Sequence, residues 1–185
     1  MKITKAQAQA NRAHIVETAS KLFREHGYDG VGVADLMAAA GFTHGGFYKH
    51  FDSKADLMAE ATVCGFSQTV AMIEDSDLAG FVQQYLSRQH RDAPGEGCTM
   101  AALSADAARQ PKPVREVFAA GLERLLAVLN PDATEDMALS RETRAKNINA
   151  IALAVGALML SRACPDDSPL ADEILETCRE KISSL

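Results

Sequence analysis

Apolar residues recur at helical spacing along almost the whole chain. Ile15, Ala19, Leu22 and Phe23 lie on one face of a helix expected from about residue 8 to residue 26. Comparable stripes predict further helices at about 53–73, 78–91, 98–111, 113–129, 140–164 and 169–182. The sequence has no stretch in which β-branched and polar residues alternate with the period of two that is typical of a strand. The pattern therefore predicts an all-α protein.

The stretch 31–50 predicts two short helices around a sharp turn. Val33, Leu36 and Met37 fall at positions i, i+3 and i+4 and form the apolar stripe of the first helix. Gly41 can adopt the left-handed backbone conformation that ends a helix, and Phe42 is expected to turn back into the core. Such a pair is a helix-turn-helix, whose second helix has the shape to enter the major groove of DNA.

The second helix of the pair is expected to begin after Thr43, whose hydroxyl can cap it. Phe47 and Tyr48 are expected to face the first helix. Gly45 and Gly46 are unusual, because each glycine inside a helix costs roughly 1 kcal/mol relative to alanine. They indicate close approach of this backbone either to DNA or to the crossing helix.

The sequence around this pair resembles the TetR family of bacterial regulators. The resemblance rests on LFREHGYDGVGV and DLMAAAGFTHGGFYKHFDSKADL, in which Gly45, Tyr48 and the run 51–57 match the family's glycine, aromatic and Phe-x-Ser-Lys-x-x-Leu positions. It covers roughly residues 9–68, and beyond them only the general helical layout is similar. The resemblance implies a three-helix DNA-binding head at 9–68 and a helical ligand-binding and dimerisation body at 69–185.

The polar outer face of the second helix, together with the resemblance, selects eight residues for contact with double-stranded operator DNA. Thr43 and His44 can reach base edges or phosphates. Tyr48, Lys49 and Lys54 are placed to bind phosphates. A solvated side chain is the alternative for each of them, and for His50 it is an equal one. The predicted contacts are Thr43, His44, Gly45, Gly46, Tyr48, Lys49, His50 and Lys54.

Large apolar side chains of the body are candidates for the pocket of an apolar effector, with plain core packing as the alternative for most of them. The predicted pocket residues are Phe66, Met72, Phe81, Tyr85, Cys98, Met100, Leu103 and Phe118. Cys98 follows the loop 92–97, the clearest expected hinge, at a helix N-terminus that favours a thiolate. A thiol or electrophile sensor acting through Cys98 is therefore the second hypothesis, and a small buried hydrophobe is its alternative.

The two C-terminal helices carry more apolar surface than one chain needs. The helix at 140–164 is apolar nearly all round, and its small residues permit close helix–helix contact. These features and the resemblance predict a homodimer with a four-helix interface, against the alternative that both helices only cover the body's own core. The predicted interface residues are Ile148, Ile151, Val155, Leu158, Ile174 and Cys178.

Charge and cysteine content narrow the function classes. The formal charge is −6, but residues 1–54 carry seven Lys and Arg against five Asp and Glu, so an acidic body stands behind a mildly basic head. The N-terminus lacks the apolar run of a signal peptide, and the longest apolar run, 150–160, is too short to span a membrane. Four cysteines without metal-binding spacing are expected to be reduced thiols in the cytoplasm. No cofactor, metal or membrane partner is expected.

The leading hypothesis is a dimeric transcriptional regulator, a repressor released from its operator by a small-molecule effector, as the resemblance implies. An enzyme is disfavoured, because the sequence has no nucleophile elbow, no phosphate-binding glycine loop and no metal spacing. A helical adaptor that binds proteins through its acidic body is the third class. Salt-sensitive, sequence-specific binding to DNA would distinguish the regulator from the other two.

Overall fold

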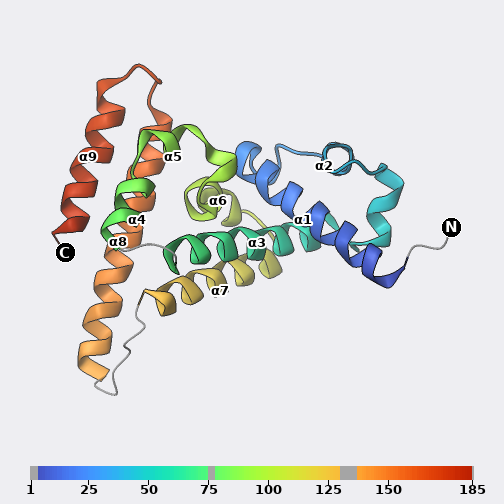
Figure 1. Cartoon of the computed structure of the whole chain (residues 1–185), viewed down its shortest axis with the longest axis horizontal. Helices are drawn as coiled ribbons and strands as arrows, with labels where there is room; N and C mark the ends of the chain where they lie inside the picture. The colour runs from blue at the N-terminus through green and yellow to red at the C-terminus, as the bar shows by residue number, and fades with distance from the viewer. Residues whose placement is uncertain (1–3, 75–77, 130–136, 185) are drawn as a thin grey trace.

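The protein is described by a computed structural model over residues 4–74, 78–129 and 137–184 (Figure 1). Within these ranges every regular element is helical, which confirms the all-α prediction. The elements are α1 (Lys5–His26), α2 (Val33–Ala39), the 3-10 helix η1 (His44–Lys49), α3 (Lys54–Glu74), α4 (Leu78–Tyr85), α5 (Arg88–Asp92), the 3-10 helix η2 (Pro94–Glu96), α6 (Thr99–Ala107), α7 (Lys112–Val128), α8 (Met137–Ala163) and α9 (Pro169–Ser183).

Figure 1 shows a small helical head at one end of the molecule and the long antiparallel pair α8 and α9 at the other. The head consists of α1, α2, η1 and the first turns of α3. From there α3 runs into the body, where it packs along α7. A single long helix therefore belongs to both parts.

The core of the head follows from the predicted apolar stripes. Ile15 and Phe23 of α1, Leu36 of α2 and Phe47 of η1 are each at most 1% exposed. Ser53 caps α3, because its hydroxyl accepts a hydrogen bond from the amide of Asp56 at 3.1 Å. The head is thus a small closed core, with η1 on its exposed surface.

Close contact between α3 and α7 depends on a glycine. A Cβ atom on Gly121 would lie 2.4 Å from Cδ2 of the buried Phe66 ring, so no larger residue fits there without a shift. Phe66 also meets Phe118 edge-on, with ring centroids 5.1 Å apart. These rings fix α3 against the body.

The helix predicted at 78–91 is two helices in the structure. Ser87 lies between them, because its backbone is extended and its hydroxyl accepts a hydrogen bond from the amide of His90 at 3.1 Å. The same hydroxyl donates to the carbonyl of Gln84 at 2.7 Å. A serine that competes in this way for backbone groups ends α4 and caps α5, which the apolar pattern alone does not indicate. Of the polar break expected at 74–77, Glu74 belongs to α3, and residues 75–77 lie outside the described residues, as does the helix end expected at 130–132.

Candidate functional site

A hydrogen-bonded turn at the end of α2 sets the direction of η1. Gly41 has a φ of 79°, a left-handed conformation that suits glycine. The amide of Phe42 donates to the carbonyl of Met37 at 2.8 Å, and the amide of Gly41 donates to that of Ala38 at 3.0 Å. These are the two bonds of a Schellman motif, so the predicted role of Gly41 is confirmed.

The element after this turn, η1, begins without the predicted side-chain cap. Thr43 has an extended backbone, but its hydroxyl makes no capping hydrogen bond. Its carbonyl instead accepts the amide of Gly46 at 2.9 Å, because the tight 3-10 turn brings that amide to the backbone. A Cβ on Gly45 would meet no atom within 4 Å, and one on Gly46 would make ordinary contact with Met37 at 3.6 Å. The crossing helix therefore does not require these glycines.

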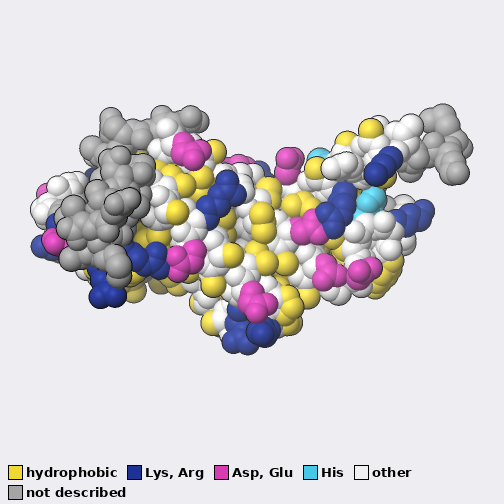
Figure 2. Space-filling model, turned by 90° about the horizontal axis from the view of Figure 1, so that it is seen from below, with side chains coloured by type: hydrophobic (Ala, Val, Ile, Leu, Met, Phe, Trp, Pro, Cys, Tyr) yellow, Lys and Arg dark blue, Asp and Glu magenta, His cyan; other side chains and the backbone are white. Residues whose placement is uncertain are grey.

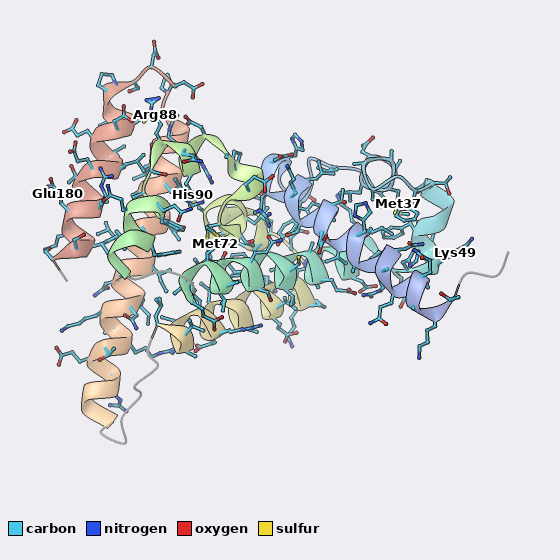
Figure 3. The ribbon with its side chains drawn as sticks, in the orientation of Figure 1. Met37, Lys49, Met72, Arg88, His90 and Glu180 are labelled. Atoms are coloured by element: carbon cyan, nitrogen blue, oxygen red, sulfur yellow. The ribbon has the colours of Figure 1, made fainter. Side chains whose placement is uncertain are left out.

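Five exposed residues form what we call the η1 face: Thr43, His44, Gly45, Tyr48 and Lys49. Tyr48 is 68% exposed, so its predicted inward orientation is wrong, whereas Phe47 is buried as predicted. The two rings meet edge-on with centroids 5.2 Å apart, which supports the exposed tyrosine on the core. Lys49 lies at the outer end of the head (Figure 3).

Two other predicted contact residues flank the η1 face and are half-buried. The ammonium of Lys54 donates to the carbonyl of Tyr28 at 2.6 Å, which ties the start of α3 to the segment after α1. An ammonium has three N–H donors, so this bond leaves donors for a phosphate. The ring of His50 lies between those of Phe42 and Phe51, at centroid distances of 6.5 and 6.3 Å. His50 is therefore largely a packing residue at the edge of the face.

An ion pair that the sequence analysis did not single out braces the same region. Arg12 of α1 binds both carboxylate oxygens of Glu60 on α3. Its guanidinium lies 4.8 Å from the ring centroid of Phe51, and its Nε donates to the carbonyl of His50 at 3.3 Å. The bidentate geometry holds α1 and α3 in one register behind the η1 face.

A buried polar junction joins the head to the body where α1 ends. Arg24 is only 6% exposed, and its Nε and Nη2 donate to the carbonyl of Gly95 at 2.9 and 2.7 Å. Its Nη1 donates to the hydroxyl of Ser20 at 2.8 Å, and that hydroxyl donates to the carbonyl of Ala61 at 2.9 Å. Burial lowers the pKa of Arg24 from its usual value. The junction therefore connects α1, α3 and the loop of η2.

This junction corrects the prediction that the loop 92–97 is a hinge. Gly95 is buried against α1, and Glu96 forms an ion pair with Lys21. The helix that follows the loop, α6, packs closely against α3, because a Cβ on Gly65 of α3 would lie 2.0 Å from the hydroxyl of Thr99 at the start of α6. The loop is a docking segment, held by contacts between residues that are far apart in the sequence.

In the described part of the chain, a polar, open hollow of about 440 Å³ lies beside Arg24 and Arg162, and two cavities with mainly apolar walls lie in the body. The larger of the two, about 260 Å³, is bounded by α3, α4, α6, α7, α8 and the end of α9. The smaller, about 140 Å³, is bounded by α3, α4, α5 and the segment 93–98. Figure 3 labels Met72 on α3 and His90 on α5, which line the smaller one.

The cavities bring together five of the eight predicted pocket residues. Met72, Phe81, Tyr85 and Cys98 line the smaller cavity, and Phe81, Tyr85 and Met100 line the larger one. The remaining three, Phe66, Leu103 and Phe118, line neither cavity and pack in the core instead. For those three the packing alternative is the correct one, because the close approach of α3 and α7 leaves no space beside the rings.

Cys98 is a buried thiol in a fixed setting. Its side chain belongs to a residue that is 4% exposed, and its amide donates to Nε2 of His90 at 3.0 Å. Nδ1 of His90 lies 2.6 Å from the carbonyl of Tyr85, so Nδ1 donates there and the ring is the neutral tautomer. Burial lowers the pKa of His90 below its usual value, which also favours this form. All four cysteines are free thiols.

The predicted dimer residues divide between two sides of α8. Leu158 is fully buried within the chain, so it is not available to a partner and that prediction is wrong. Ile151 and Val155 line the larger cavity. Ile148, by contrast, is 45% exposed, and on α9 the predicted Ile174 is half-buried.

Other apolar residues that the sequence analysis did not select lie open on the outside of α8 and α9. Leu160 is 61% exposed, Leu170 53% and Met159 36%. A Cβ on Gly156 would meet no atom within 4 Å. Cys178, a further predicted interface residue, is half-buried on α9 and packs against the core. We call the exposed apolar residues Ile148, Met159, Leu160 and Leu170, with Gly156, the outer face of α8 and α9; the other exposed residues of α9 are mostly polar or charged.

The charges of the described surface are mixed. At the head end in Figure 2, Lys, Arg and His side chains stand beside Asp and Glu side chains. Among the described residues there is no group of three or more His, Cys, Asp and Glu side chains that is arranged to hold a metal ion. No helix in the described part of the chain has both the length and the hydrophobicity to cross a bilayer.

Comparisons with known proteins point to one family. The family model described as "Bacterial regulatory proteins, tetR family" matches residues 15–61, which contain most of α1, α2, η1 and the start of α3. The HTH-type transcriptional repressor DhaR of a Mycobacterium species is 32% identical over 101 residues, which are 51% of this chain and 51% of DhaR. The chain spans about a quarter to a half of the length of the first curated relatives it matches.

Solved structures show the same fold at low identity. The reduced form of Escherichia coli NemR superposes with a TM-score of 0.75 and 19% identity, over 95% of this chain and 96% of NemR. AibR, solved in complex with isovaleryl coenzyme A and operator DNA, superposes with a TM-score of 0.59 and 18% identity, over 93% of this chain and 97% of AibR. Head and body thus share one known architecture.

Proposed function

Since the chain belongs to the TetR family of bacterial regulatory proteins, a family of DNA-binding transcriptional regulators, we propose that it represses transcription and leaves its operator when a small molecule binds. The observation that carries this proposal is the η1 face. A Schellman turn fixes its direction, Tyr48 and Lys49 stand free on it, and the matched family region encloses it. We assign residues 9–68 to DNA binding and 69–185 to ligand binding and dimerisation.

We assign separate roles to the residues of the η1 face and its flanks. Tyr48 and Lys49 bind phosphates, because their polar ends are exposed at the outer end of the head. Lys54 contributes its remaining donors from the edge, and the open Gly45 lets the sugar-phosphate backbone approach. His44 and Thr43 read base edges at the start of η1.

The assignment is tested by titrating a DNA fragment from upstream of the gene at several salt concentrations. Lys49→Ala should weaken binding to every sequence alike and reduce the salt slope by about one. His44→Ala should change which bases are preferred. Lys112→Ala is the control, because Lys112 is an exposed lysine of the body. Salt-independent binding, or equal effects of all three variants, would contradict the assignment.

We propose that the regulator acts as a homodimer through the outer face of α8 and α9. The exposed Leu160, Leu170 and Ile148 and the open Gly156 support this. A two-fold dimer presents two η1 faces, so the operator should be a rough palindrome with half-sites on the order of 34 Å apart. A footprint over one asymmetric half-site would argue against the dimer.

Of the two signalling mechanisms we propose the non-covalent one. The cavities offer space for a molecule inside the body, whereas Cys98, in the wall of the smaller cavity, exposes only 4% of its surface. α3 carries Thr69 and Met72 at the cavities and Lys54 at the head, so a ligand that shifts α3 moves the η1 face. The coupling free energy of such switches is typically about 1–3 kcal/mol, and operator DNA should weaken ligand binding by the same factor.

A further inference from the structure

The two cavities are neighbours that share part of their walls. Thr69, Phe81 and Tyr85 line both of them. The larger, of about 260 Å³, is close to the lower end of the range of about 300–1,000 Å³ found for small-molecule sites. A cavity of about 150 Å³ already holds benzene, so the larger cavity has room for a bicyclic aromatic molecule.

The hydroxyl of Tyr85 lies in this shared wall without a nitrogen or oxygen partner, and the neighbouring thiol of Cys98 is only a weak hydrogen-bonding group. Tyr85 is 6% exposed, and its oxygen is shielded from solvent. Leaving a buried hydroxyl unpaired is costly, so such a group is expected where a partner arrives from outside the chain. Burial, together with the neighbouring Cys98, raises the pKa of Tyr85 well above its usual value, so the hydroxyl keeps its proton and can donate.

Three other polar side chains of these walls, those of His90, Thr69 and Asn147, already have partners within the chain. Both ring nitrogens of His90 bind backbone groups, of Tyr85 and Cys98. The hydroxyl of Thr69 donates to the carbonyl of Gly65 at 3.1 Å. In the larger cavity the amide nitrogen of Asn147 donates to the carbonyl of Leu129 at 3.1 Å.

The charged groups of these walls are also paired or lie at the rim. Glu96 binds Lys21, and the exposed Lys146 binds Glu142 at 3.2 Å. The cation that acts on Tyr85 is Arg162, which lines neither cavity and donates to the carbonyls of Arg91 and His90 at 2.9 and 2.8 Å. A ligand anion in the cavities would therefore give up its hydration without a cation in direct contact.

We propose that the two neighbouring cavities bind an uncharged, mainly apolar molecule whose carbonyl oxygen accepts a hydrogen bond from Tyr85. The apolar part, an aromatic or branched aliphatic group, fills the larger cavity against Ile151 and Val155. The carbonyl lies at the boundary with the smaller cavity. This inference rests on the proposed effector-responsive function and names the chemical class of the effector.

Three probes of nearly equal size separate the contributions of the hydrogen bond, the apolar contact and a negative charge to binding. They are 2-acetylnaphthalene, 2-isopropenylnaphthalene and 2-naphthoate. They present a ketone, a methylene group of the same shape and a carboxylate. Dissociation constants are measured by calorimetry with the dimer in the absence of DNA. The ketone should bind roughly threefold to tenfold more tightly than the alkene, the effect of one hydrogen bond. The carboxylate should bind more weakly than both.

Variants then identify the donor. Tyr85→Phe should remove the preference for the ketone while leaving the alkene affinity unchanged. Tyr48→Phe is the matched control, since Tyr48 lies on the η1 face, and it should keep the preference. Ala154→Phe should fill the larger cavity and abolish binding of both neutral probes. Unfolding midpoints close to that of the parent establish that each variant is folded.

Equal affinity for ketone and alkene in the parent, an unchanged preference in Tyr85→Phe, or tightest binding of the carboxylate would overturn the inference. Binding of none of the probes would overturn it too. Because these measurements contain no DNA, they are independent of the regulatory function. A ketone preference that depends on Tyr85, without release of operator DNA, would support the ligand class and contradict the proposed effector response.

Discussion

Replacing Arg24 with methionine tests whether the buried junction holds the head to the body. Arg24→Met keeps an unbranched apolar stem of similar length and removes all three hydrogen bonds of the guanidinium. The carbonyl of Gly95 loses both donors and stays buried. We therefore expect the variant to fold less stably and to couple head and body less tightly.

The size of the effect follows from two opposing terms. Hydrogen bonds from a charged donor contribute about 1.5–3 kcal/mol each, so the three set an upper bound of about 9 kcal/mol. Much of this loss is offset by desolvation. The parent buries a charged guanidinium that is bonded only to uncharged oxygens, which costs free energy, and the methionine variant has no such buried charge. We expect the free energy of unfolding to fall by about 2–4 kcal/mol and Tm to fall on the order of 10 °C.

Arg88→Met is the matched control. Arg88 makes four hydrogen bonds, to the carboxylate of Asp172 and the carbonyl of Asp166, but it is exposed. If burial decides how much an arginine's hydrogen bonds contribute to stability, Arg88→Met should leave Tm nearly unchanged although it removes more hydrogen bonds than Arg24→Met. Urea and thermal unfolding of both variants are compared at pH 7.5. A Tm of Arg24→Met equal to or above the parent, or a larger loss at Arg88, would refute the reasoning.

Three further predictions use other parts of the molecule. Gly121→Ala should lower the free energy of unfolding, measured in urea, by about 1–3 kcal/mol, because its Cβ would overlap the ring of Phe66. Gly45→Ala should leave the free energy of unfolding unchanged, because its Cβ would meet no atom within 4 Å, but should weaken DNA binding in an anisotropy titration. Burial lowers the pKa of His90 in the folded state below its usual value of 6.5, so near that pH the unfolded chain binds more protons than the folded one. The free energy of unfolding should therefore fall as the pH drops from 7.5 to 5.5, by at most about 1.4 kcal/mol per pH unit. His90→Asn should flatten this slope in urea titrations. Leu160→Glu places a charge on the outer face of α8, so light scattering should give the mass of a monomer and operator affinity should fall.

Each of these predictions has a contrary result. Equal stability of both glycine variants would mean that α3 and α7 adjust without cost. A slope in His90→Asn as steep as in the parent would assign the pH dependence to other groups. A Leu160→Glu protein that stays dimeric would place the interface away from the outer face of α8 and α9.

The sequence predicts the head well because its signals are local. The left-handed conformation at Gly41, the cap at Ser53 and the burial of Phe47 each depend on neighbours within a few residues. Tyr48 shows the limit of the pattern, since an aromatic residue on a short helix fits the core or the surface equally well. Its exposure follows from the 3-10 geometry of η1, which the apolar spacing does not specify.

The body is predicted less well because its features depend on distant contacts. Ile151, Val155 and Leu158 are all apolar residues of one helix, and the sequence cannot tell a cavity wall, a core position and an interface apart. Arg24 is a second case, because only the fold brings the carbonyl of Gly95 to it across a long sequence separation. Helical periodicity gives the buried side of a helix but not the identity of what covers it.

The junction changes how a signal from the cavities can reach the DNA-binding face. α3 is the covalent link, but the segment from His90 to Cys98 lines the smaller cavity and also contains Gly95, which Arg24 binds at the end of α1. A ligand that displaces the ring of His90 would release the amide of Cys98 and shift this segment against α1. Lys54 donates to the carbonyl of Tyr28, so the start of α3 and the segment after α1 are held together at the edge of the η1 face. Both links act on one rigid head, and we therefore expect the head to rotate as a unit instead of bending within α3.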